Sequence, residues 1–214
     1  EKWTFRTDGY EATNFGMLSG NTEWQKEATM KIIDAAIKIG AKLVVLPECG
    51  HAYMALRWQG ANMLGKPLPF KVMHISEYMA DALNTGKIRV KKVDKSVTYH
   101  DPCQVSRRGG ATQAARDVLK HLGVDFREME FGGDYNWCCG GGGGVVTIKR
   151  ADPLRRRVFK LKMDQVEKTE ADELLSACAN CRQSFDDSQE HFNWDYKMGS
   201  LMETVAENLE EDGS

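Results

Sequence analysis

The chain has 214 residues, of which 42% are hydrophobic and 28% charged, as expected for one globular domain or two small ones. The formal net charge of -2 gives no electrostatic reason to expect a nucleic-acid partner. No apolar run approaches the roughly 18 residues that span a bilayer, so we expect any membrane association to come through another subunit.

The start of the chain and its cysteine content bear on its setting. The sequence opens at Glu1 with neither an initiator Met nor a signal-like apolar stretch, and we expect a longer polypeptide with a region missing upstream. Without a signal peptide the expected compartment is the cytoplasm, where thiols stay reduced. Six cysteines in that setting indicate metal ligation or redox chemistry before structural disulfides.

The first half predicts two strands and two helices. We expect a strand over residues 3–6 and a helix from the N-cap Asn21 to about Ile39, with Gly40 as its stop. The helical spacing of Trp24, Ala28, Ile32, Ala35 and Ile39 predicts a buried face. A buried strand over residues 42–46 ends at Pro47-Glu48-Cys49-Gly50-His51, and a second helix is predicted over residues 74–83.

The second half repeats this layout. The basic stretch 87–95 marks the boundary, giving a first lobe over residues 1–94 and a second over residues 95–214. Strands are predicted over 96–100, 124–129 and 173–177, and helices over 110–121, 152–169 and 200–209. Asp152 and Pro153 are the expected N-cap and first residue of the middle helix. Arg155, Arg156 and Arg157 are expected on its solvated face.

Alternating strands and helices with short connections predict an α/β fold of two pseudo-symmetric lobes, with mainly parallel sheets flanked by helices. The cysteines fall where strands end: Cys49, Cys103 and Cys178 each follow a predicted strand. The Cys138-Cys139 pair lies in the glycine-rich loop after another. Because sites in such folds form at the carboxyl ends of strands, cysteines that are distant in sequence should converge in space.

The cysteine spacing points to a metal centre. From Cys103 there are 34 residues to the Cys138-Cys139 pair and 38 more to Cys178-Ala179-Asn180-Cys181. Soft thiolates favour iron–sulfur clusters or zinc. Five cysteines are one more than a structural zinc or an ordinary cubane needs, and neighbouring cysteines suit different irons of one cluster. A zinc scaffold and a thioredoxin-like role for Cys178 and Cys181 are the weaker interpretations.

Three segments carry a family resemblance: His100-Asp101-Pro102-Cys103, Trp137-Cys138-Cys139-Gly140-Gly141-Gly142 and Cys178-Ala179-Asn180-Cys181. Together they resemble the cysteine-rich CCG domain of the heterodisulfide reductase B subunit, also found in glycolate oxidase, lactate-utilisation and glycerol-3-phosphate dehydrogenase subunits. The first half, with Glu11-Ala12-Thr13-Asn14-Phe15-Gly16 and Glu48-Cys49-Gly50-His51-Ala52, resembles the catalytic K subunit (DsrK) of the membrane-bound Dsr complex of dissimilatory sulfur metabolism.

This resemblance implies one noncubane [4Fe-4S] cluster held by all five cysteines: Cys103, Cys138, Cys139, Cys178 and Cys181. Full members carry two complete motifs, whereas here the first half has only Cys49, and Leu46 stands where the first cysteine of a C-x-x-C would be. We therefore expect one cluster, in the second lobe. Further cubane clusters are expected on the missing upstream region or on partner subunits.

The implied reaction is the cleavage or formation of a disulfide or trisulfide carried by a small DsrC-type protein. Electrons would come from other iron–sulfur subunits or a membrane quinol-linked cytochrome-type subunit, which places the protein on the inner face of the membrane. The alternative is an electron-transfer subunit of a glycolate, lactate or glycerol-3-phosphate dehydrogenase-type complex.

Other residues are candidates for further parts in this site. Gly140, Gly141 and Gly142 are expected to let backbone N–H groups approach the cluster, as successive glycines do around a bound anion. Cys49 is either a small buried hydrophobe or a thiol facing the cluster. His51 is a candidate proton donor to a released thiolate, whereas His100 is expected to hydrogen-bond the turn at Asp101-Pro102.

Overall fold

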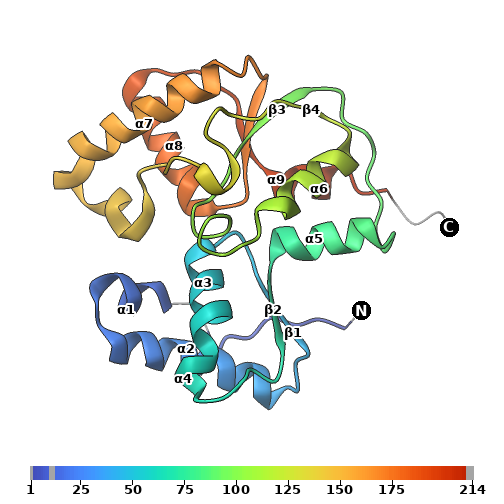
Figure 1. Cartoon of the computed structure of the whole chain (residues 1–214), viewed down its shortest axis with the longest axis vertical. Coiled ribbons are helices and arrows are strands. Elements are labelled where there is room, and N and C mark those ends of the chain that lie inside the picture. Colours follow the sequence, from blue (N-terminus) through green and yellow to red (C-terminus); the bar gives the residue numbers. More distant parts are fainter. Residues whose placement is uncertain (1, 10–12, 211–214) are drawn as a thin grey trace.

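The computed structural model describes residues 2–9 and 13–210, and it forms two α/β lobes stacked along the long axis of the molecule (Figure 1). Glu11 and Ala12 of the first-half resemblance lie outside the described residues. The elements of the first lobe are α1 (Thr13–Ser19), α2 (Thr22–Lys38), β1 (Leu43–Leu46), α3 (Gly50–Met54), the π-helix η1 (Ala55–Gln59), α4 (Gly60–Leu64) and β2 (Lys71–His74). β1 and β2 pair in parallel.

The second lobe is built on a four-stranded parallel sheet in the order β4-β3-β5-β6. Its strands are β3 (Ser96–His100), β4 (Asp125–Phe126), β5 (Glu173–Ser176) and β6 (Met198–Ser200). Its α-helices are α6 (Thr112–Leu122), α7 (Asp152–Glu167), α8 (Ala179–Phe192) and α9 (Leu201–Glu207), and the 3-10 turns are η2 (Gly133–Tyr135), η3 (Gly142–Thr147) and η4 (Lys149–Ala151). The expected α/β fold with parallel sheets is confirmed.

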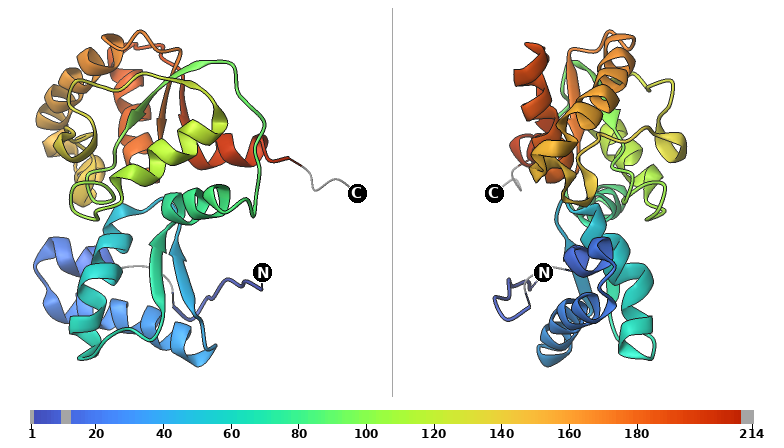
Figure 2. Two further views of the ribbon diagram at one scale, coloured as in Figure 1. Left: turned by 45° about the vertical axis from the view of Figure 1, so that its right-hand side comes forward. Right: turned by 90° about the vertical axis from the view of Figure 1, so that its left-hand side faces the viewer.

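Helices cover both faces of the larger sheet (Figure 2). Leu175 of β5 packs with residues of α6 and α9 on one face, and its neighbour Leu174 packs with α7 and α8 on the other. Successive strand residues point to opposite faces, so one strand serves both cores. α5 (Ile75–Asn84) follows β2 in the chain, yet its buried Ala80 and Leu83 pack with α6 in the second-lobe core.

Several predicted elements are confirmed, with shifts that have physical causes. Helix α2 begins after Asn21, whose Oδ1 accepts from the backbone N–H of Trp24 at 3.0 Å. Its buried face includes the expected Ile32 and Ala35 but is rotated at the start of the helix: Gln25 and Thr29 are buried, whereas Trp24 is 63% exposed, and Ile39 after the helix is 43% exposed. A polar residue can lie inward where a partner exists, and Thr29 donates to the carbonyl of Gln25 at 2.7 Å.

Three sequence predictions are wrong in detail. Residues 3–6 form no strand, and the rings of Trp3 and Phe5 instead pack on each other with centroids 5.3 Å apart. The strand expected over 124–129 shortens to β4, because only its first residues pair with β3. Helix α7 has Ala151 as its N-cap, one residue before the expected Asp152. In the part of the chain that the structure describes, no helix has the length and apolar composition of a transmembrane segment.

Candidate metal centre

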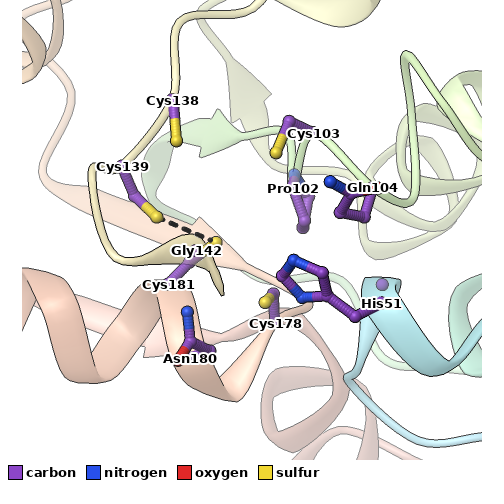
Figure 3. Close-up of a pocket in the computed structure, with 11 residues that line it drawn as sticks. His51, Pro102, Cys103, Gln104, Cys138, Cys139, Gly142, Cys178, Asn180 and Cys181 are labelled. Atoms are coloured by element: carbon purple, nitrogen blue, oxygen red, sulfur yellow. Dashed lines mark hydrogen bonds between the residues drawn. The ribbon is translucent and has the colours of Figure 1, made fainter. Parts of the chain in front are cut away.

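Five of the six cysteines lie around one pocket where the two lobes meet (Figure 3). They are the five expected ligands: Cys103, Cys138, Cys139, Cys178 and Cys181. The pocket has about 270 Å³ of space, its open mouth included. The sixth cysteine, Cys49, packs against the hydrophobic core of the first lobe and is not among the residues that line the pocket.

The strand order explains this convergence. Cys103 comes three residues after β3, and Cys178 comes two residues after the neighbouring strand β5. Because the strands are parallel, both cysteines reach the same edge of the sheet. Cys181 follows in the first turn of α8, and the Cys138-Cys139 pair approaches from the loop between η2 and η3. Residues far apart in the sequence therefore meet: Cys139 and Cys181 are separated by 42 positions, and their Sγ atoms are 3.4 Å apart.

Hydrogen bonds among the thiols separate their pKa values. The thiols of Cys103 and Cys139 donate to Cys138, and this lowers the pKa of Cys138 to about 2. Hydrogen bonding from Cys181 lowers the pKa of Cys178 to about 7. The same contacts raise the pKa of Cys103 and of Cys181, because each thiol donates its hydrogen bond to a neighbouring sulfur and so keeps its proton, and burial adds to the effect. Only a bound cationic centre would let all five lose their protons together.

The glycine loop supplies backbone donors to this cage. The N–H of Gly140 points at Cys138 Sγ, 3.3 Å away, and that of Gly141 points at Cys139 Sγ, 3.4 Å away. Gly140 has a φ of 81°, which favours glycine. A Cβ at Gly141 would lie 2.6 Å from the Cβ of Ser184, so a side chain does not fit there. The N–H groups of Gly140 and Gly141 thus approach cysteine sulfurs, and the part of the three glycines toward a cluster stays a prediction.

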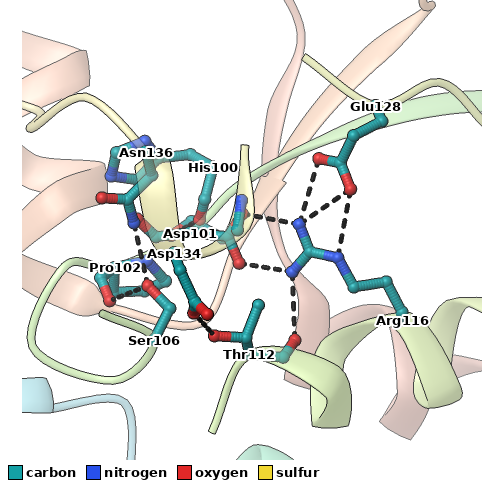
Figure 4. A network of polar contacts seen from close by, with 11 residues as sticks. His100, Asp101, Pro102, Ser106, Thr112, Arg116, Glu128, Asp134 and Asn136 are labelled. Carbon is teal, nitrogen blue, oxygen red and sulfur yellow. Dashed lines mark hydrogen bonds and ion pairs between the residues drawn. The ribbon is translucent and has the colours of Figure 1, made fainter. Parts of the chain in front are cut away.

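A buried polar network holds the two cysteine loops in place (Figure 4). Asp101, two residues before Cys103, receives two hydrogen bonds from Arg116, at 2.5 and 2.7 Å, and one from the N–H of Gly133 at 2.7 Å. The side-chain amide of Asn136 donates to the carbonyl of Asp101 at 2.6 Å. Asp101 thus ties the Cys103 turn to the segment that leads into Cys138.

His100 does not behave as the sequence suggested. The expectation that it hydrogen-bonds the turn at Asp101-Pro102 is wrong: neither ring nitrogen has a hydrogen-bond partner among the described residues. The ring is 1% exposed and packs edge-on against Phe185, with centroids 4.9 Å apart. Its nitrogen and the sulfurs of Cys139 and Cys181 all lie within 4.8 Å of one another. Burial holds the pKa of His100 well below its usual range, so the ring faces the thiols in its neutral form.

Sequence reasoning also missed a buried lysine behind the cage. Lys162 of α7 is 1% exposed, and its Nζ contacts Met129 Sδ at 3.7 Å. Burial lowers the pKa of Lys162 to about 8, and the nearby thiols oppose that shift. The sequence does carry a signal, because Lys162 stands at core spacing with Phe159, Met163 and Val166 on one helical face.

Arg155 is a second correction on the same helix. It was expected on the solvated face with Arg156 and Arg157, yet it is 2% exposed and pairs with Asp152 at 3.1 Å and Asp187 at 2.5 Å. Its stem lies against the glycine loop, since a Cβ at Gly140 would be 3.2 Å from Arg155 Cγ. The two acidic partners allow the Arg155 charge to be buried, although a run of three arginines is usually exposed to solvent.

The first lobe contributes part of the pocket wall. Glu48, at the end of β1, accepts the N–H of Ala179 on its carbonyl at 3.0 Å, and its carboxylate binds Arg182 at 2.7 Å and Ser200 Oγ at 2.6 Å. His51, 8% exposed, follows in α3 and lines the pocket opposite Gly142. Its place over the thiols agrees with the proton-donor role expected from the sequence, which stays a prediction.

The donor set fits an anionic thiolate-bound cluster. Five thiols line the pocket, two backbone N–H groups are aimed at their sulfurs, and a buried ammonium without an acidic ion-pair partner among the described residues contacts Met129 in the same core cluster. The N–H donors and the ammonium favour the negative charge that thiolate ligands would bring. Tetrahedral zinc would use four thiols and leave the fifth over.

Comparison with known proteins agrees with this interpretation. Residues 97–186 match the family described as "Cysteine-rich domain", named CCG. This part of the chain is a CCG cysteine-rich domain. It includes all five cysteines of the cage and the glycine loop, whereas the first lobe lies outside the matched residues.

Three relatives extend the similarity beyond this CCG domain. The chain is 36% identical to the D subunit of a dihydromethanophenazine:CoB–CoM heterodisulfide reductase from Methanosarcina barkeri, over 86% of this chain and 45% of that protein. It is 27% identical to Hdr-like menaquinol oxidoreductase iron-sulfur subunit 2 of Archaeoglobus fulgidus, over 96% and 44%. It is 26% identical to EtfAB:quinone oxidoreductase of Syntrophomonas wolfei, over 82% and 25%. The chain therefore spans less than half the length of each of these relatives.

Proposed function

We propose that the chain is the cluster-binding part of a heterodisulfide-reductase-like oxidoreductase subunit that opens or closes a sulfur–sulfur bond. The observation that carries the proposal is the convergence of five thiols and two N–H···S donors in one pocket with an open mouth. The ligands are Cys103, Cys138, Cys139, Cys178 and Cys181, and the cofactor is one noncubane [4Fe-4S] cluster. Similarity to a heterodisulfide reductase subunit supports the same chemistry.

When bound, the cluster would supply the electrons and the iron sites at which sulfur chemistry occurs. The protein's own residues would position and protonate the substrate. Cleavage of a disulfide breaks one S–S bond, consumes two electrons and two protons, and yields two thiols. His51 lines the pocket mouth and is placed to give a proton to one leaving sulfur from its ring nitrogen. Gly142 lies beside His51, where a Cβ would be in ordinary contact at 3.7 Å from His51 Cε1.

The proposed substrate is a disulfide or trisulfide on the arm of a small DsrC-type protein. The pocket lies where the two lobes meet, and we expect a thin chain end to reach the sulfurs while the bulk of a carrier stays outside. Electrons would pass through other iron–sulfur subunits and a membrane quinol-linked subunit, which would hold the chain at the inner face of the membrane. This setting comes from the resemblance to the Dsr complex, and the menaquinol oxidoreductase relative is consistent with it.

A second candidate is an electron-transfer subunit of a dehydrogenase-type complex that joins a flavin subunit to quinone. The observation in its favour is the similarity to EtfAB:quinone oxidoreductase, which covers 82% of this chain. The two functions differ in one respect: only the first releases thiols from a disulfide or trisulfide substrate. The dehydrogenase role needs the cluster but no open sulfur site.

The test starts with iron, zinc and acid-labile sulfide on anaerobically purified protein, where about four irons and four sulfides per chain are expected. One zinc without sulfide would refute the proposal. Thiol release from a DsrC-type trisulfide by the reduced protein then separates the two candidates. Cys139→Ser and Cys181→Ser should lose both iron and thiol release. Cys49→Ser serves as the matched control, because Cys49 lies outside the pocket and iron content should be retained.

A further inference from the structure

Lys162 presents an electrostatic problem within the folded chain. Its side chain is 1% exposed, and no acidic residue forms an ion pair with it in the ranges 2–9 and 13–210 that the structure describes. The carboxylate of Asp101 acts on it electrostatically, but Arg116 and the N–H of Gly133 already hydrogen-bond that carboxylate. A thioether sulfur, that of Met129, is a poor partner for an ammonium. A buried charge without compensation is costly, so its retention needs an explanation.

The position of the lysine indicates where its counter-charge belongs. The groups that act on it electrostatically include the thiols of Cys139, Cys138 and Cys181, which come from the glycine loop and from α8. Lys162 does not line the pocket, whereas His51 of the first lobe does. Met129, which the Lys162 Nζ contacts at 3.7 Å, packs in the same buried cluster as Cys139, Cys178 and Cys181, so the ammonium lies in the core beside the thiols. His100 lies close enough for the lysine charge to help keep its ring neutral, which leaves Lys162 as the cation behind the cage.

We propose that Lys162 is the built-in counter-charge of the metal centre, a positioning residue whose ammonium stabilises the anionic thiolate-bound cluster and raises its reduction potential. The inference rests on the proposed cluster but concerns a residue that binds neither iron nor substrate. An electron added to the cluster increases its negative charge, so a fixed cation in a low-dielectric setting favours the reduced state over the oxidised one. Arg155 on the same helix does not take this part, because Asp152 and Asp187 already neutralise it.

The test compares wild type with Lys162→Met and Lys162→Gln, which remove the charge with an apolar and a polar side chain of similar length. Lys160→Met is the matched control: it lies on the same helix, is 52% exposed and pairs with Asp164 at 2.9 Å. The measurements are iron and sulfide content, the midpoint potential from an anaerobic redox titration followed by EPR, and melting temperatures of the cluster-loaded and metal-free forms.

Both Lys162 variants should shift the midpoint potential to more negative values, and cluster loading should raise their melting temperature by less than in wild type. Their metal-free forms should melt at or above the wild-type temperature, because the uncompensated charge is gone. Lys160→Met should match wild type throughout. Failure of both Lys162 variants to take up iron, with metal-free melting intact, would also support the counter-charge role.

Two results would overturn the inference alone. One is a wild-type potential in both loaded variants. The other is a lower melting temperature of both metal-free variants, which would make Lys162 a structural residue. A wild-type protein that takes up no iron and sulfide would overturn the proposed function and this inference together, so the two failures can be told apart.

Discussion

The ion pair between Asp101 and Arg116 gives the sharpest test of how the cysteine loops are held. Asp101 is 2% exposed and Arg116 16% exposed in their side chains, and two hydrogen bonds join them. Asp101→Asn removes the charge, leaves Arg116 facing a neutral amide and keeps the size of the side chain. Arg116 retains Glu128, at 2.9 Å, as its remaining carboxylate (Figure 4).

The expected loss is large because the pair is buried. Removing one partner of a buried ion pair costs about 3–5 kcal/mol, since the other charge stays desolvated. For a chain of this size each kcal/mol lowers the melting temperature by roughly 2–4 °C, which places the expected decrease for Asp101→Asn near 10 °C. The Gly133 and Asn136 contacts loosen at the same time, so we also expect lower iron content in anaerobically purified protein.

The assay is thermal unfolding of the metal-free protein, together with iron and sulfide analysis of the purified form. Glu128→Gln is the matched control, because Glu128 is 45% exposed in the same network and an exposed pair contributes less than about 1 kcal/mol. A double variant, Asp101→Asn with Arg116→Met, should cost less than the sum of the single changes. If Asp101→Asn melted no lower than Glu128→Gln, the ion pair between Asp101 and Arg116 would not be what holds the cysteine loops in place.

Two further predictions concern the glycine loop and a buried histidine. Gly141→Ala should lower iron and sulfide content, since its Cβ would lie 2.6 Å from Ser184 Cβ. Gly142→Ala should retain them, because the nearest contact of its Cβ is at 3.7 Å. Equal loss of iron in both variants would contradict the steric argument. Burial lowers the pKa of His74 from 6.5 to about 4 in the folded chain. As the pH falls from 6.5 to 4, the unfolded chain therefore takes up a proton at His74 before the folded chain does, and about 3 kcal/mol of stability should be lost. The variant His74→Asn keeps an N-cap acceptor for the N–H of Ser76. Urea unfolding at pH 7 and pH 4.5 should show that this variant loses less stability between the two pH values than wild type. An equal loss of stability would place the acid sensitivity at other residues.

The sequence predicts the chemistry of the site better than its surroundings. The ends of β3 and β5 could be read from short apolar runs, and parallel pairing then dictates that Cys103 and Cys178 meet. Burial of charged residues could not be read in the same way. Arg155 stands beside Arg156 and Arg157 and resembles a solvated residue. Lys162 stands at core spacing on α7, yet only the packing of α7 against the sheet shows that both charged side chains lie inside. His100 was misassigned for a related reason, because its environment comes from Phe185, which is 85 residues away in the chain.

Short elements were also beyond the sequence signal. β2 and β6 have four and three residues, and their pairing depends on neighbours that no local pattern specifies. Helix α8 was missed although it carries Cys181, because its buried positions include Ser184 and Ser188 in place of large apolar side chains. Those serines allow close approach of the glycine loop: Ser184 Oγ donates to the carbonyl of Cys139 at 3.1 Å. The residues that weaken the amphipathic pattern are those that the site needs.

The first lobe has a single cysteine, yet it takes part in the site through its backbone. The N–H of Gly50 donates to the sulfur of Cys178, and the carbonyl of Glu48 accepts the N–H of Ala179. Gly50 can lie this close because it has no side chain: a Cβ there would be 2.8 Å from Gln104 Cβ. The start of α8, with two of the five expected ligands, is therefore fixed by the end of β1 as well as by β5. Docking of the lobes and the arrangement of the five cysteines are thus coupled, and a lobe without a complete cysteine motif of its own donates hydrogen bonds to the motif of the other.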